Sequence, residues 1–164
     1  MKKQGFTLIE LMVVIVIMGI LAAVAVPKLF GMIAKSKASE IPTAAGSYIN
    51  MQDAFALERN TVGNWTEIGY SAPGKKSHAS KYASSEFEYT GADPQKKTTA
   101  VADAWKAVNI NKLDDCDAKE GSWNLTIQIG TGNNQGNVQY TVGANGSAEC
   151  AGLTPAFDKL AKSL

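Results

Sequence analysis

The sequence predicts an α+β protein in which a long, kinked N-terminal helix packs on an antiparallel sheet of about four strands. Three observations support this prediction. Residues 11–26 form an uncharged apolar run, and helical spacing of apolar residues continues to about residue 59. Alternating apolar and polar residues then recur in the second half of the chain, as expected for strands that are buried on one face.

The apolar run has the length of a membrane span. From Phe6 to Val26 it covers 21 residues, which as a helix extend about 31 Å at roughly 1.5 Å per residue. The hydrocarbon core of a bilayer is about 30 Å thick. Glu10 lies inside this run, where an unpaired carboxylate costs at least about 3 kcal/mol. The sequence therefore marks Glu10 as a functional candidate that needs a partner.

The residues before Glu10 suggest that partner. Cleavage of the Gly5–Phe6 bond would leave a primary amine on Phe6, one helical turn before Glu10. Within one chain this amine points along the helix axis, but a neighbouring helix shifted by roughly 6 Å would place its amine beside the carboxylate. Such a pair is favoured at low dielectric over two isolated charges. We therefore expect Phe6 and Glu10 of adjacent copies to set the stagger of helices in a filament.

Residues 2–27 closely resemble the N-terminus of type IV pilins of class a, the N-methyl-Phe type. The resemblance implies a pilin fold, a basic leader at residues 1–5, cleavage after Gly5 by a prepilin peptidase, and N-methylation of Phe6 by the same enzyme. Beyond about residue 30 only the layout is comparable with that family. The positions that match the family's motif are Gly5, Phe6, Glu10, Gly19 and Pro27.

Two simpler interpretations remain open. A secretory signal peptide would be cut after Ala25, but this leaves Glu10 and the Gly5–Phe6 junction without a role. A plain membrane anchor, with Lys2 and Lys3 kept in the cytoplasm, also leaves Glu10 unexplained. The anchored state is expected in any case as the reservoir of subunits before assembly.

The predicted helix divides into a membrane and polymerisation half, residues 6–27, and an amphipathic half, residues 28–59. Gly19, Pro27 and Pro42 interrupt it, because glycine weakens a helix and proline removes a backbone donor. The pilin resemblance implies that residues 19–27 can melt into extended chain in a filament; a simple kink is the alternative. The stripe expected to face the head comprises Ile41, Ala44, Ala45, Tyr48, Met51, Gln52 and Phe55.

Residues 60–164 are expected to form the globular head. Residues 60–99 are predicted to be a loop region with one short strand at Phe87 and Tyr89, and residues 100–153 the sheet. The sheet strands are expected at residues 105–110, 123–129 and 138–142, with a hairpin loop at residues 130–136. Thr154 and Pro155 predict the start of a short C-terminal helix over residues 154–164, lined by Phe157, Leu160 and Leu164.

Cys116 and Cys150 are the two cysteines of the chain. An even count in an exported domain favours a disulfide, and closing a loop of this length would contribute about 4 kcal/mol on the chain-entropy model. A reduced buried pair is the alternative. The spacing resembles that of the disulfide near the C-terminus of type IV pilins.

No catalytic constellation, metal site or cofactor site is expected. His78 lies in a loop rich in lysine and serine, and a solvated turn is favoured over a calcium site for the acidic residues 114–117. Trp123 is expected in the core because it lies on the apolar face of its strand, whereas Trp65 is the one tryptophan considered for a sugar-stacking surface. Without Lys2 and Lys3 the side chains carry a net charge of −1, so there is no basic surplus for nucleic acid.

Together these features predict a structural subunit of a type IV pilus and not an enzyme. Before assembly it would lie in the bacterial inner membrane with its head in the periplasm, and after assembly in an extracellular filament. Its expected partners are further copies of itself, the prepilin peptidase, the membrane, and an inner-membrane assembly platform with an ATPase. A pseudopilin of a type II secretion system and a minor tip pilin that binds DNA or carbohydrate are the alternatives.

Overall fold

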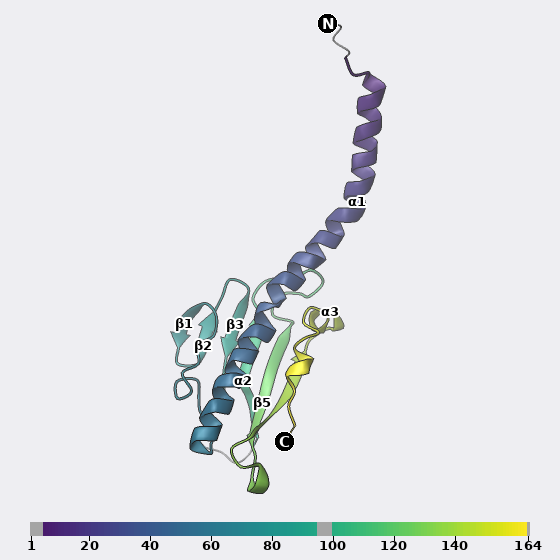
Figure 1. Ribbon diagram of the computed structural model, residues 1–164. Coiled ribbons are helices and arrows are strands. Elements are labelled where there is room, and N and C mark those ends of the chain that lie inside the picture. Colours follow the sequence, from purple (N-terminus) through teal and green to yellow (C-terminus); the bar gives the residue numbers. More distant parts are fainter. Residues whose placement is uncertain (1–4, 95–99, 164) are drawn as a thin grey trace.

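The structure is a computed structural model that describes residues 5–94 and 100–163. Figure 1 shows a long bent helix that enters the head and crosses one face of a sheet. The helix consists of α1, Leu8–Ala38, and α2, Glu40–Arg59. The predicted α+β class and the long N-terminal helix are therefore confirmed. Residues 1–4 of the expected leader, residues 95–99 and Leu164 lie outside the described residues.

Within the described residues, six antiparallel strands form one sheet in the order β1-β2-β3-β4-β5-β6. The predicted number of about four is wrong, because two further strands lie in the region predicted as loop. Strand β1 is exposed throughout, so it lacks the alternation that marks a half-buried strand, and β2 is only three residues long, too short to show a period. The strands are β1, Lys75–His78; β2, Lys81–Ala83; β3, Phe87–Thr90; β4, Val101–Asn109; β5, Ser122–Ile129; and β6, Val138–Asn145.

Strand β4 begins earlier than predicted and contains a bulge. The register of its pairing with β5 shifts between Val101 and Trp105, and Asp103 within this stretch has a φ of 51°. An extra residue in one strand breaks the alternation of side chains. As a result the consecutive residues Ala104 and Trp105 are both fully buried.

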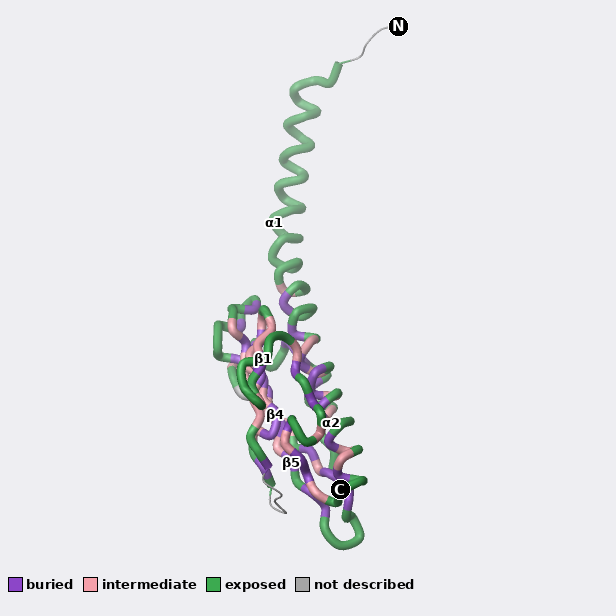
Figure 2. Tube along the Cα trace, turned by 90° about the vertical axis from the view of Figure 1, so that its left-hand side faces the viewer, coloured by how far each residue is buried: buried purple, intermediate pink, exposed green. Residues whose placement is uncertain are grey.

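The buried stripe of the helix faces the sheet. Figure 2 shows that α1 is exposed over most of its length, whereas buried residues appear where the helix meets the head. Seven residues were expected in this stripe, and one of them, Met51, is exposed, while Ala56 one turn further on is buried. The buried residues of α2 are Ile41, Ala44, Ala45, Tyr48, Gln52 and Ala56.

A hydrogen-bonded chain of aromatic residues joins helix, loop and sheet. The indole Nε1 of Trp105 donates to the Tyr70 hydroxyl at 2.9 Å, and that hydroxyl donates to the Ala44 carbonyl at 3.0 Å. Burial raises the pKa of Tyr70 well above its usual range. The hydroxyl therefore stays protonated and links α2 to β4 through the loop that precedes β1.

Replacing Tyr70 with phenylalanine is expected to lower the free energy of unfolding by about 1–3 kcal/mol, because it leaves a buried indole donor and a buried carbonyl unsatisfied. Thermal unfolding followed by tryptophan fluorescence measures this change. Tyr82→Phe is the matched control, since its hydroxyl makes only a 3.4 Å hydrogen bond to Ser71 in a partly buried place. Equal melting temperatures for the two variants would contradict the proposed role of the Tyr70 hydroxyl.

The C-terminal segment differs from the predicted helix over residues 154–164. A short helix α3, Ala148–Ala151, precedes it, and the helical part of residues 154–163 is a 3-10 turn η2, Asp158–Leu160. Thr154 does not cap a helix, because its Oγ1 accepts a 2.6 Å hydrogen bond from the indole of Trp123. Lys162 then pairs in strand fashion with Tyr140 through backbone hydrogen bonds of 2.9 and 3.0 Å. These tertiary contacts leave no room for a continuous helix.

Asp53 ties α2 to the last strand and to the C-terminal segment. Its carboxylate accepts from the Tyr140 hydroxyl at 2.8 Å and forms an ion pair with Lys162 at 2.9 Å. Tyr140 also approaches the Ile49 carbonyl at 3.2 Å. Burial, with the hydrogen bond to Asp53 as a second cause, raises the pKa of Tyr140 far above its usual range. The hydroxyl is thus a permanent donor to the helix.

Candidate functional site: the exposed apolar helix

The free half of α1 exposes an unusual amount of apolar surface. Its large apolar side chains from Phe6 to Val26 are between 45% (Val26) and 85% (Phe6) exposed. In the part of the chain that the structure describes, this is the helix that is long and apolar enough to cross a membrane. An apolar surface of this size on a soluble monomer marks a surface for lipid or for other protein.

Glu10 is held at the start of α1 by a capping box with Thr7. The carboxylate oxygen Oε2 of Glu10 accepts from the Thr7 backbone N–H and from its hydroxyl, both at 2.8 Å, and the Glu10 N–H donates to Thr7 Oγ1 at 3.3 Å. This reciprocal arrangement satisfies donors that every helix leaves free at its N-terminus. Within this chain, therefore, Glu10 is paired with Thr7.

The role of Thr7 as the capping partner of Glu10 was not identified from the sequence. The spacing Thr7-Leu8-Ile9-Glu10 matches the capping-box pattern, and this pattern could have identified it. Gly5 and Phe6 lie just before the cap, exposed and outside the helix. The bond expected to be cleaved is therefore accessible, and the new N-terminus would lie directly beside the capping box.

The three predicted interruptions behave differently along the helix. Gly19 and Pro27 lie inside α1, which stays helical through both of them, and Figure 1 shows the helix bending along its course. The break between α1 and α2 falls at Ser39, three residues before Pro42. Pro42 has no N–H to donate to the carbonyl four residues before it, which explains a break at this point. Melting of residues 19–27 in a filament stays a prediction.

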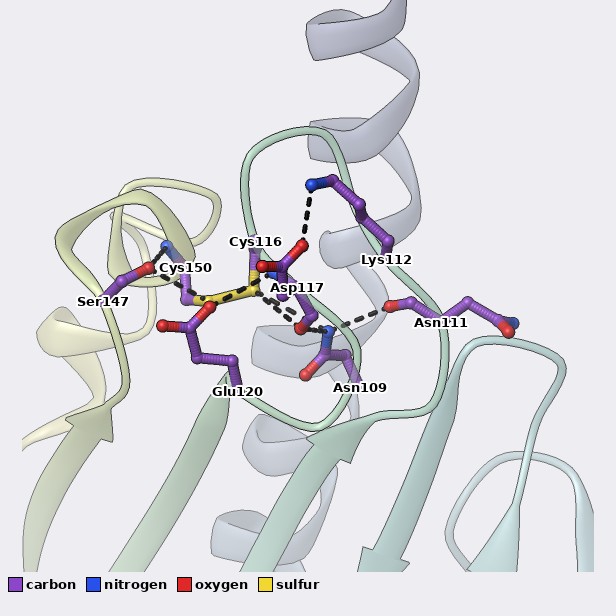
Figure 3. Close-up of polar contacts among 8 residues, drawn as sticks. All are labelled: Asn109, Asn111, Lys112, Cys116, Asp117, Glu120, Ser147 and Cys150. Carbon is purple, nitrogen blue, oxygen red and sulfur yellow. Dashed lines mark hydrogen bonds and ion pairs between the residues drawn. A yellow bond between two sulfur atoms is a disulfide. The ribbon is translucent and has the colours of Figure 1, made fainter.

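The disulfide between Cys116 and Cys150 closes the end of the head beside α1, as Figure 3 shows. The two sulfurs are 2.07 Å apart and both cysteines are buried. Asn109, also buried, fastens the same connection: its Nδ2 donates to the carbonyls of Asn111 and Asp117, and its Oδ1 accepts from the N–H of Gly121 at 2.9 Å. The disulfide and the hydrogen bonds of Asn109 thus both fix the connection between β4 and β5.

The acidic residues of this connection are partly neutralised by a lysine. Lys112 Nζ lies 2.7 Å from Asp117 Oδ1. The hydrogen bond to Asp117, followed by the charges of Asp117, Asp115 and Asp114, raises the pKa of Lys112. Among residues 5–94 and 100–163, no group of three or more His, Cys, Asp or Glu side chains is arranged to hold a metal ion.

Trp65 does not form a surface platform, and the sugar-stacking interpretation is wrong. Its side chain is 1% exposed, and its Nε1 donates to the Ala104 carbonyl at 2.9 Å. Gly91 leaves the space that the indole needs, since a Cβ there would lie 2.3 Å from Nε1. Trp65 packs in the core against Tyr48, Tyr70 and Tyr82. His78 is exposed on β1.

Comparison with known proteins supports the interpretation of the N-terminal helix. The family model described as the prokaryotic N-terminal methylation motif matches residues 1–26. The relatives include the type IV major pilin protein PilA of Myxococcus xanthus, 41% identical over 70 residues, which are 42% of this chain and 32% of that protein. The type IV major fimbrial protein FimA of Dichelobacter nodosus is 38% identical over 68 residues, 39% of this chain and 44% of its own. Over these N-terminal segments the chain is similar to type IV pilins.

Pseudopilins are among the relatives of this pilin-like chain. The type II secretion system core protein G of Klebsiella pneumoniae is 33% identical over 84 residues, 49% of this chain and 60% of that protein. The chain therefore spans between about a third and three fifths of the length of these curated relatives. No solved structure matches it significantly.

Proposed function

We propose that this chain is a structural subunit of a type IV pilus, with no enzymatic activity. The observation that carries the proposal is a single carboxylate, Glu10, in the first turn of α1. The rest of residues 6–27 is uncharged, and the apolar surface of this stretch has no covering in the monomer. A plain anchor gains nothing from this charge. A filament does gain from this charge, because the carboxylate meets the amine of a neighbouring helix at only one stagger.

Cleavage is the step that changes the partner of Glu10. A prepilin peptidase would cut after Gly5 and methylate Phe6, leaving a cationic N-terminus next to the Thr7 cap. The capping box keeps the carboxylate at the helix end, where the amine of a neighbour shifted by about one turn, roughly 6 Å, would reach it. Burial of the apolar helices then drives assembly, and a misplaced charge costs several kcal/mol.

The proposed route begins in the inner membrane. The span of α1 would hold the subunit with its head in the periplasm until an assembly platform and its ATPase extract it into an extracellular filament. The N-terminal mass of sheared surface material tests this proposal. A chain that begins at N-methylated Phe6 supports it; a chain that begins at Met1 or at Val26 would favour an anchor or a signal peptide.

Replacing Gly5 with leucine is expected to stop processing, because a bulky side chain then occupies the exposed junction that the peptidase must bind. Mass spectrometry of membrane fractions should show full retention of residues 1–5 and no filaments. Gly19→Leu serves as the control, since a Cβ at Gly19, as at Gly5, meets nothing within 4 Å. Normal cleavage of the Gly5→Leu chain would contradict the proposed site.

A pseudopilin of a type II secretion system is the second candidate, favoured by the match to core protein G. Such a subunit would form a short periplasmic filament and would not accumulate in sheared surface material. Fractionation distinguishes the two functions directly. Calcium titration of the purified protein adds a second measurement: stabilisation through the acidic residues 114–117 would support the pseudopilin.

A further inference from the structure

One lateral edge of the head is basic. Strand β1 is the outermost strand, and all four of its residues are exposed. We call Lys75, Lys76, His78 and the adjacent Lys81 the lysine edge. No Asp or Glu occurs between residues 68 and 85. Lys81 is paired with Glu88 at 2.9 Å, so Lys75 and Lys76 provide most of the charge at this edge.

The other side of the head is acidic. The connection between β4 and β5 and the short helix α3 carry five acidic residues against two lysines, Lys112 and Lys119. The disulfide holds these two segments together, and Figure 3 shows two of the acidic residues around it. We call this surface the acidic corner; its acidic residues are Asp114, Asp115, Asp117, Glu120 and Glu149.

The two surfaces are separated across the sheet. Figure 1 places β1 at one edge of the head and α3 at the other. The chain as a whole is almost neutral. The two surfaces therefore reflect a separation of positive from negative charges and not a net excess of either sign. Two different, complementary patches on one molecule form a heterologous contact, which repeats from copy to copy and generates open helical assemblies.

We propose that the lysine edge of one head contacts the acidic corner of the next head in the filament. This inference rests on the proposed function, and it adds the surface of the head that joins neighbours. The occupant of the lysine edge is thus a second copy of this chain. The disulfide contributes indirectly, because it holds Glu149 beside the β4–β5 connection.

The proposed contact mainly sets the orientation of each head relative to its neighbour, and it adds little to the binding free energy. Exposed ion pairs contribute only about 0–1 kcal/mol each and are weakened by salt. Complementary charges instead favour one orientation and penalise others. The apolar helices hold the filament together, and the head contact selects how each head faces its neighbour.

Zero-length crosslinking with a carbodiimide tests the contact in native filaments, because this reagent joins an amine to a carboxylate only where they touch. Mass spectrometry should find amide links from Lys75 or Lys76 to Asp115 or Glu149. The same reagent on detergent-solubilised monomers should give none of these links. Links present equally in monomers, or absent from filaments, would overturn the proposal.

Charge reversal provides the genetic test. Lys75→Glu with Lys76→Glu should reduce sheared filaments at least about fivefold, because like charges then face each other. Adding Asp115→Lys and Glu149→Lys to that variant should restore most of the loss. Arg59→Glu with Lys159→Glu, two exposed residues outside both surfaces, makes the same change in net charge and should assemble normally.

The outcomes separate this inference from the proposed function. If the wild-type chain forms no filament, the proposed function itself fails. If wild-type filaments form and the reversed chain assembles equally well, only the head contact is refuted. A further outcome is that filaments of the reversed chain form intact but bind an acidic polymer less tightly than wild-type filaments do. That result would show that the lysine edge binds the polymer, and it would also overturn the proposal.

Discussion

Glu10→Gln is expected to abolish filaments while leaving membrane insertion and cleavage after Gly5 intact. Glutamine is nearly the same size, and its side-chain oxygen can still accept from Thr7, so the helix cap survives. What is lost is the negative charge that the amine of a neighbouring Phe6 would meet. Without it, that amine is buried unpaired, which costs several kcal/mol for every subunit added. Immunoblots of sheared and membrane fractions measure the result.

Thr7→Ala is the matched control for this experiment. It removes the hydroxyl that bonds to the Glu10 carboxylate and N–H, at a cost of about 1 kcal/mol to the start of the helix, but it keeps the charge. We expect this variant to assemble. Normal fibres from Glu10→Gln would show that the charge-pair explanation is wrong. If both variants fail alike, the helix cap is the essential feature instead.

Replacing both Cys116 and Cys150 with alanine is expected to have the largest effect on the stability of the head. On the chain-entropy model the disulfide contributes about 4 kcal/mol, and for a protein of this size each kcal/mol corresponds to roughly 2–4 °C in melting temperature. We therefore expect a fall of roughly 10 °C or more. Circular dichroism of the detergent-solubilised full chain measures it.

Reduction of the wild-type chain provides the control for this variant. Loss of the bond alone should reproduce most of the fall, and the remainder reports the cavity left by two small buried side chains. Filament yield should fall in parallel, since the disulfide fixes the connection that lies beside α1. A melting temperature unchanged by both treatments would show that Asn109 and the core hold this connection without the bond.

The helix and the C-terminal hairpin could be predicted from sequence because their signals are local. The uncharged run to Val26 and the spacing of Ile41, Ala45 and Tyr48 define one face of a helix without reference to the rest of the fold. The strict alternation around Leu125 and Ile127 defines β5 in the same way. Glu10 could be identified for a similar reason, because a single charge in an apolar run is visible in the local sequence without knowledge of tertiary contacts.

The errors concern features that depend on distant partners. Strand β1 exists because its backbone pairs with β2, and its exposed polar sequence carries no period. Trp65 is buried because Gly91 and the Ala104 carbonyl, far along the chain, make a place for its indole. Thr154 looked like a helix cap, but its hydroxyl is taken by Trp123. None of these partners can be identified from neighbouring residues.

The strand order described above has a consequence for how the head acquires its structure. Every strand after β1 pairs with the one just before it in the chain, so the sheet can grow hairpin by hairpin from β1 to β6, and such short-range contacts favour fast folding. The contacts that hold α2 are instead long-range in sequence, because Asp53 binds Tyr140 and Lys162, which lie 87 and 109 residues later in the chain. The contacts that hold α2 against the last strand and the C-terminal segment can therefore form only when almost the whole chain is available.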